Sequence, residues 1–150
     1  MRTLARVIAS GLGSGYSPKA PGTAGSLLAL IFGAWMLTGP AWVLWLAIIA
    51  AVLLGLWAIG PAGGTEDPGW VVIDEFAGQW IALLPLGHFS WTGLLAAFAL
   101  FRLFDITKPG PVGWADRQHG AFGVMADDII AGAMAAIVIF ALRMALPTWF

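Results

Sequence analysis

The chain has no cysteine and few charged residues. Its 150 residues include 7 Lys or Arg and 8 Asp or Glu, so 10% are charged, whereas 60% are hydrophobic. Without cysteine there can be no disulfide framework, thiolate metal site or phospho-cysteine intermediate. Ordinary soluble domains have about 25% charged residues, and a domain of this length needs polar cover for its exposed surface. The composition therefore predicts a membrane protein.

The net charge of -1 is close to zero. A nucleic-acid partner would call for a clustered basic surface, which this chain lacks. Arg2 and Arg6 precede a weakly apolar stretch with no cleavable signal pattern, so we treat the chain as mature. Its length is typical of one domain, here residues 1–150.

Long apolar runs dominate the chain. No charged residue lies between Lys19 and Glu66, which leaves room for two spanning helices of about 20 residues each. Gly39 and Pro40 punctuate this run. We expect an all-α, polytopic membrane bundle of about four to five hydrophobic helices, some short or re-entrant. The expected segments are Ala24–Leu37, Trp42–Ile59, Val71–Leu86, Trp91–Phe104 and Ile129–Leu146.

The charged residues gather on one side of this predicted bundle. With Arg2, Arg6 and Lys19 placed inside by the positive-inside rule, alternating segments also place the 60–70 and 105–128 loops inside. Arg143 falls toward the outer end, where its long side chain can reach the interface. His88 is expected in an outer, solvated turn. Nearly every charge therefore faces the cytoplasm.

Six carboxylates form the main candidate site. An ionised Asp at mid-bilayer costs roughly 2.5–3.5 kcal/mol, so several such residues must lie at the interface, in a wet cavity or beside a cation. Isolated acids could instead cap helices, and some could form interface salt bridges. A whole set on one side favours a metal site. The candidate ligands, also the candidate catalytic set apart from Asp116, are Asp74, Glu75, Asp105, Asp116, Asp127 and Asp128.

The chemistry expected of this set is metal-assisted phosphate chemistry. Mg²⁺ prefers oxygen ligands and completes its shell with substrate phosphate. Lys108 and Arg117 could hold phosphate oxygens. His119 could transfer a proton at neutral pH, although it could also be an ordinary loop residue.

A Gly-rich segment precedes the first long apolar run. Residues 11–18 and 21–26 could offer backbone N–H groups to an anion at a helix N-terminus, with Ser17 and Thr23 as candidate phosphate-binding residues. The segment lacks the Gly-Lys-Ser/Thr ending of a Walker A loop. Alternatively, Thr23 is an ordinary helix N-cap.

The motifs resemble the phosphatidylglycerophosphatase A family over nearly the whole chain. The similar segments include residues 13–18, 21–27, 72–78 and 101–105, followed by Lys108-Pro109, Asp116-Arg117, His119-Gly120 and Asp127-Asp128. The resemblance implies a bacterial inner-membrane, Mg²⁺-dependent phosphoric monoester hydrolase. Its substrate would be phosphatidylglycerophosphate, which it would convert to phosphatidylglycerol at the cytoplasmic leaflet. The six carboxylates match the family's acidic positions, and Lys108 and Arg117 match its basic ones.

Other readings stay open at the level of sequence. Direct attack by water and an aspartyl-phosphate intermediate are both compatible with these residues, and the number of metal ions is not determined. A small ion-coupled transporter would also use intramembrane acids, but the acids here lie on one face and the chain has no repeat. A membrane scaffold would not need a dense acidic site. An alcohol phosphotransferase would need a motif spacing that is missing here.

Overall fold

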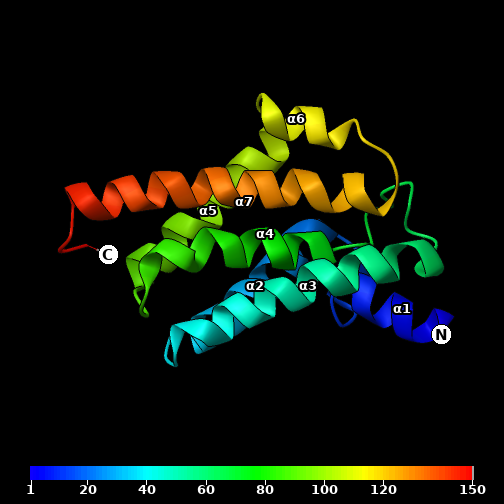
Figure 1. Ribbon diagram of the computed structural model, residues 1–150, viewed down its shortest axis with the longest axis horizontal. Coiled ribbons are helices and arrows are strands. Elements are labelled where there is room, and N and C mark those ends of the chain that lie inside the picture. The colour runs from blue at the N-terminus through cyan, green and yellow to red at the C-terminus, as the bar shows by residue number, and fades with distance from the viewer. Residues whose placement is uncertain (150) are drawn as a thin grey trace.

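The computed structural model describes residues 1–149, and these are helical without any strand (Figure 1). The expected all-α class is therefore confirmed. The α-helices are α1 (Arg2–Ala9), α2 (Pro21–Met36), α3 (Ala41–Ala62), α4 (Ile73–Leu83), α5 (Trp91–Thr107), α6 (Pro111–Asp116) and α7 (Gly120–Ala145). Two short 3₁₀ helices, η1 (Ser14–Tyr16) and η2 (Leu84–Leu86), complete the regular structure.

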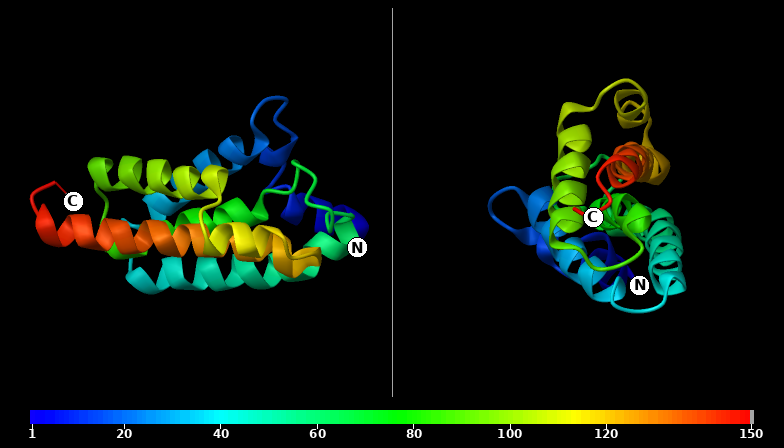
Figure 2. Two further views of the ribbon diagram at one scale, coloured as in Figure 1. Left: turned by 90° about the horizontal axis from the view of Figure 1, so that it is seen from above. Right: turned by 90° about the vertical axis from the view of Figure 1, so that its left-hand side faces the viewer.

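Helix α4 lies at the centre of the bundle. It packs against α2, α3, α5 and α7, which surround it when the bundle is viewed from its end (Figure 2). Most of its residues are buried, including the polar Asp74 and Gln79. Because α4 contacts four other helices, a polar side chain on any of its faces is at least partly buried.

Two helices have the length and composition of membrane spans. They are α3, with 22 residues, and α7, with 26 residues, each of which contains an apolar stretch of 18 residues, while α2 is a shorter apolar helix. Large apolar side chains on α3, such as Trp45, Leu46 and Leu53, are exposed. Exposed apolar surface of this kind fits a lipid environment better than water.

Close packing of α4 against α7 depends on two glycines. A Cβ on Gly132 would lie 2.3 Å from the carbonyl oxygen of Gly78, and a Cβ on Gly78 would lie 2.6 Å from that of Asp128. Small residues let the two backbones touch, as they commonly do in membrane helix pairs. Asp74 and Asp128 each lie one turn before these glycines, so this crossing brings their side chains together.

The long polar loops share one end of the molecule. The loops after α1, α3 and α5, together with α6, lie toward the end that carries the N-terminus, and the tight turns after α2 and η2 lie at the other (Figures 1 and 2). His88 is exposed in the latter region, as expected. Arg143 lies there too, but it is not simply extended to the interface, because its guanidinium donates to the Pro85 carbonyl.

Several boundaries differ from those expected. Helix α7 begins at Gly120 rather than Ile129, so Asp127 and Asp128 lie two turns inside the helix instead of at its start. Helix α3 continues through Pro61 to Ala62, although Pro cannot donate the backbone hydrogen bond of a helix interior. The predicted 105–128 loop contains α6, and α1 was not expected.

Thr23 is not a helix N-cap. Helix α2 begins at Pro21 after Ala20, so Thr23 is its third residue. Pro favours the first helical position because its missing N–H would be unpaired there in any case.

Candidate active site

Three of the predicted carboxylates converge between α4 and α7. One carboxylate oxygen from each of Asp74, Glu75 and Asp128 lies within 4.8 Å of the other two. Asp74 and Asp128 are buried, and the Glu75 side chain is only 12% exposed. We call these three residues the carboxylate triad. Three acids at this spacing repel one another unless a cation or protons neutralise them.

Each residue of the triad has a carboxylate oxygen without a hydrogen-bond partner among the described residues. Asp74 Oδ1, Glu75 Oε2 and Asp128 Oδ2 are buried, and no hydrogen-bond partner for them occurs among residues 1–149. Leaving such groups unpaired is costly. Clustered carboxylate oxygens are the ligands that hard divalent cations prefer. The donor set therefore fits Mg²⁺.

Arg102 on α5 borders the triad. Its Nη1 lies 3.9 Å from Glu75 Oε1 and 2.5 Å from Asp105 Oδ2, and it donates to the hydroxyl of Ser26 at 3.3 Å. Arg102 thus connects α5 to α2 and α4, and it partly offsets the negative charge of the triad.

The N-terminus of α2 lies against this arginine and glutamate. A Cβ on Gly22 would lie 2.3 Å from Glu75 Oε1 and 3.3 Å from Arg102 Nη1. Only a glycine lets the backbone approach so closely. The positive end of the α2 dipole therefore faces the acidic site.

Lys108 joins two of the remaining acids. Its ammonium lies 2.9 Å from Asp127 Oδ2 and also pairs with Asp116. Partial burial lowers the pKa of Lys108, but the two carboxylates outweigh this effect, and its pKa is raised above the usual value. Lys108 is therefore a permanent positive charge between α5, α6 and α7.

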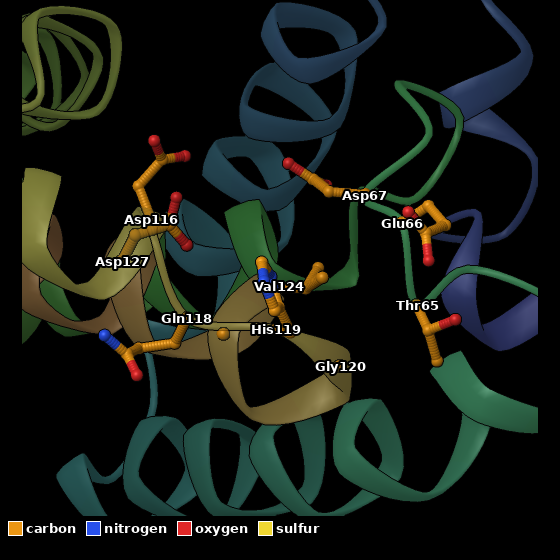
Figure 3. A pocket seen from close by; sticks show the side chains of 10 residues that line it. Thr65, Glu66, Asp67, Asp116, Gln118, His119, Gly120, Val124 and Asp127 are labelled. Carbon is orange, nitrogen blue, oxygen red and sulfur yellow. The ribbon is translucent and has the colours of Figure 1, made fainter.

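A polar pocket of about 320 Å³ adjoins this ion-pair cluster. Figure 3 shows Asp67 and Glu66 on one side of the pocket and Asp116 and Asp127 on the other, with His119 between them. Desolvation in the pocket raises the pKa of Asp67, and the nearby Lys108 opposes that rise. Asp67 has a backbone φ of 49°, which is strained for a residue with a side chain.

The other predicted site residues do not join the triad. His119 precedes α7 and lines the polar pocket. Arg117 is exposed, and the described residues offer it no ion pair. Ser17 donates its hydroxyl to the Lys19 carbonyl at 2.9 Å. Thr23 is partly buried in the first turn of α2.

The sequence reasoning missed Arg102, Asp67 and Gln79 as site residues. Arg102 and Gln79 lie in apolar helical stretches, and a basic or amide group inside such a stretch was the available signal. Gln79 is fully buried one turn beyond Glu75, and neither its oxygen nor its nitrogen has a hydrogen-bond partner among the described residues. Asp67 follows Glu66 in a loop whose fold could not be deduced.

Residues 7–143 match the family described as phosphatidylglycerophosphatase A. The chain belongs to this family. The enzyme class expected from the sequence, a phosphoric monoester hydrolase, is thereby confirmed. No solved structure matches the chain.

Three relatives illustrate the range of the family. Phosphatidylglycerophosphatase A of Escherichia coli is 39% identical over 139 residues, which is 89% of this chain and 80% of that protein. The Haemophilus influenzae protein of the same name is 41% identical over 142 residues, or 91% and 87% of the two chains. A Bacteroides thetaiotaomicron relative, provisionally assigned as a phosphatidylinositol-3-phosphatase, is 40% identical over 149 residues, or 91% and 92%.

Proposed function

We propose that this protein is a Mg²⁺-dependent phosphatase that hydrolyses phosphatidylglycerophosphate to phosphatidylglycerol and phosphate. The observation that carries the proposal is the carboxylate triad, whose unpaired oxygens suit a divalent cation. Asp74, Glu75 and Asp128 would hold Mg²⁺. When bound, the ion would neutralise charge on the phosphoryl group and lower the pKa of a coordinated water.

The neighbouring residues can bind and orient a phosphate monoester. Lys108 is held by Asp116 and by Asp127, the residue before Asp128, and Arg102 lies beside Glu75. Both cations can donate to phosphate oxygens. The backbone N–H groups of the first turn of α2, at Gly22 and Thr23, form a third anion-binding element.

Hydrolysis requires a nucleophile and a proton for the departing alcohol. We favour attack by water: its oxygen bonds to phosphorus as the bond from phosphorus to the glycerol oxygen breaks. The water gives up one proton to solvent, and the glycerol oxygen takes one from an acid. His119 is the candidate donor, because it lines the pocket beside Asp127. A triad carboxylate acting as nucleophile is the alternative, and trapping of a phosphorylated chain would support it.

The reaction would take place at the cytoplasmic leaflet of the bacterial inner membrane. We infer that α2, α3, α4 with η2, α5 and α7 form the membrane bundle and cross it in alternate directions. Arg2, Arg6 and Lys19 share the polar end with the triad, and this basic segment would remain on the cytoplasmic side. A lipid phosphate at the interface would then lie level with the triad.

Phosphate release from phosphatidylglycerophosphate in mixed micelles tests the proposal. We expect release with Mg²⁺, none with excess chelator, and a large loss in both Asp74→Asn and Asp128→Asn. His88→Gln, at the opposite end, is the matched control and should retain activity. If the folded wild type releases no phosphate with any divalent cation, the assignment fails and an ion-coupled transporter becomes the leading alternative.

Thermal unfolding separates metal binding from turnover. Mg²⁺ at 100 times its dissociation constant should stabilise the wild type by about 2.7 kcal/mol, whereas Asp128→Asn should gain little. Phosphatidylinositol 3-phosphate, tested beside phosphatidylglycerophosphate, addresses the substrate named for the Bacteroides thetaiotaomicron relative. Equal or faster turnover of the inositol lipid would overturn the proposed substrate but not the phosphatase class.

A further inference from the structure

Gln79 is a buried amide in an otherwise apolar part of α4. Its side chain is not exposed to solvent, and neither its oxygen nor its nitrogen has a hydrogen-bond partner among residues 1–149. An unpaired amide in apolar surroundings costs free energy, and buried polar side chains nearly always have a partner. A leucine would fill the same position without that cost. The amide therefore indicates that Gln79 serves a polar group nearby.

Helix geometry directs this amide toward Glu75. Residues four apart on a helix are neighbours on one face, and side-chain hydrogen bonds form at this spacing. Side chains also lean toward the N-terminus of their own helix, which for Gln79 is the direction of Glu75. Glu75 Oε2 is itself buried and has no hydrogen-bond partner in the described part of the chain. The amide nitrogen of Gln79 is a donor that this oxygen can use.

Arg102 offers the complementary group from α5. Helix α5 packs against this part of α4, because the Phe101 ring lies 2.4 Å from the position of a Cβ on Gly78. The next residue, Arg102, reaches Glu75 through Nη1, whereas its Nε is buried without a partner among the described residues. Arg102 Nε can only donate, and the amide oxygen of Gln79 can accept. Two donors and two acceptors on three neighbouring side chains thus complement one another.

We propose that Gln79 is a positioning residue that links Glu75 to Arg102. Its amide N–H donates to Glu75 Oε2, and its amide oxygen accepts from Arg102 Nε, directly or through one buried water. Each carboxylate oxygen can accept about two hydrogen bonds, so Glu75 Oε2 can accept from Gln79 and still coordinate a cation. The inference rests on the proposed Mg²⁺ site and gives a role in it to a residue outside the triad.

Magnesium binding in the absence of substrate tests this role. Gln79→Met keeps the approximate size of the side chain and removes both amide groups. Calorimetric titration of the full-length protein in detergent micelles with Mg²⁺ alone should show an affinity about 10–100-fold below that of the wild type. Leu83→Met is the matched control, because Leu83 is fully buried one turn further along α4, and it should bind Mg²⁺ like the wild type. Wild-type affinity in folded Gln79→Met would overturn the proposal.

A combined variant shows whether Gln79 acts together with Arg102. Side chains in one hydrogen-bond network have non-additive effects, so Gln79→Met with Arg102→Lys should lose less Mg²⁺ affinity than the product of the two single losses. A loss equal to that product would contradict the link. A wild type that binds Mg²⁺ and releases phosphate beside an unaffected Gln79→Met would exclude only the role of Gln79. A wild type that binds no Mg²⁺ would exclude the proposed metal site as well.

Nuclear magnetic resonance provides a test that leaves Gln79 in place, should Gln79→Met not fold. The chain has no asparagine and two glutamines, Gln79 and Gln118, so Gln118→Ser leaves a single carboxamide. In ¹⁵N-labelled Gln118→Ser, the remaining side-chain NH₂ signals should shift on addition of Mg²⁺ and saturate together with the binding measured by calorimetry. Signals that do not move while Mg²⁺ binds would place Gln79 outside the metal site and overturn the proposal.

Discussion

At the scale of single residues, Arg102 links three helices around the carboxylate triad. It lies within an apolar helix, yet it reaches Glu75, Asp105 and Ser26 at once. All three contacts are made by Nη1, and a lysine would have to bring its ammonium to the same point from a differently shaped side chain. The role of Arg102 therefore depends on geometry as well as on charge.

We predict that Arg102→Lys weakens Mg²⁺ affinity by about 10–100-fold, as is usual when a group that orients metal ligands is changed. The measurement is the Mg²⁺ concentration that gives half-maximal phosphate release. Arg143→Lys, at the other end of the bundle, is the control and should behave like the wild type. A wild-type Mg²⁺ requirement in Arg102→Lys, combined with an increased one in Arg102→Gln, would mean that charge alone matters.

The acidic residues could be found from the sequence because charges are rare in an apolar chain. Their division into the triad and the acids that pair with Lys108 could not be predicted, because neighbouring residues on a helix point about 100° apart. Asp128 faces the triad, whereas Asp127 pairs with Lys108. Only the packed structure shows which face of α7 meets α4.

At the scale of helices, the crossing of α4 and α7 sets the spacing of the triad. A methyl group on Gly132 would overlap the Gly78 carbonyl at 2.3 Å, whereas a methyl group on Gly60 of α3 would meet nothing within 4 Å. Both glycines are helical, so the intrinsic helix preference for Ala over Gly applies equally to both. The two positions therefore separate helix packing from helix propensity.

We predict that Gly132→Ala destabilises the protein by about 1–3 kcal/mol, the usual cost of overpacking, and raises its Mg²⁺ requirement because the triad is displaced. Gly60→Ala should be neutral or slightly stabilising. Thermal unfolding and the Mg²⁺ dependence of phosphate release measure the two effects. Unchanged stability and activity in Gly132→Ala would show that α4 and α7 can separate without disturbing the site.

The sequence predicted the presence of the long helices better than it predicted where they begin and end. The apolar runs located α2 to α5 and most of α7, since apolar length is a strong signal. The start of α7 was wrong by nine residues because Gly120 and Gly123 are typical of loops. Gly123 lies in the first turn of α7, where a Cβ would be 2.2 Å from the carbonyl oxygen of Gln118, five residues earlier. A glycine is needed there by the way the chain enters the helix, so its presence did not mark a loop.

At the scale of the whole molecule, the polar end and the opposite end should face different compartments. The loop after α3 contains Thr65, and the turn before α5 contains His88; both residues are exposed. Because the chain has no cysteine, a single introduced cysteine reports on one position without background. The natural composition thus makes the protein suitable for accessibility labelling.

We predict that Thr65→Cys in intact cells resists a membrane-impermeant maleimide, because the positive charge of the N-terminal segment holds that end in the cytoplasm. His88→Cys should react with the same reagent, and both should react once the cells are opened. Reaction of both from outside would mean that α4 with η2 does not cross the bilayer. Reaction of Thr65→Cys alone from outside would mean that the bundle has the inverted orientation. The triad would then face the outer leaflet, and a substrate in the cytoplasmic leaflet would be excluded.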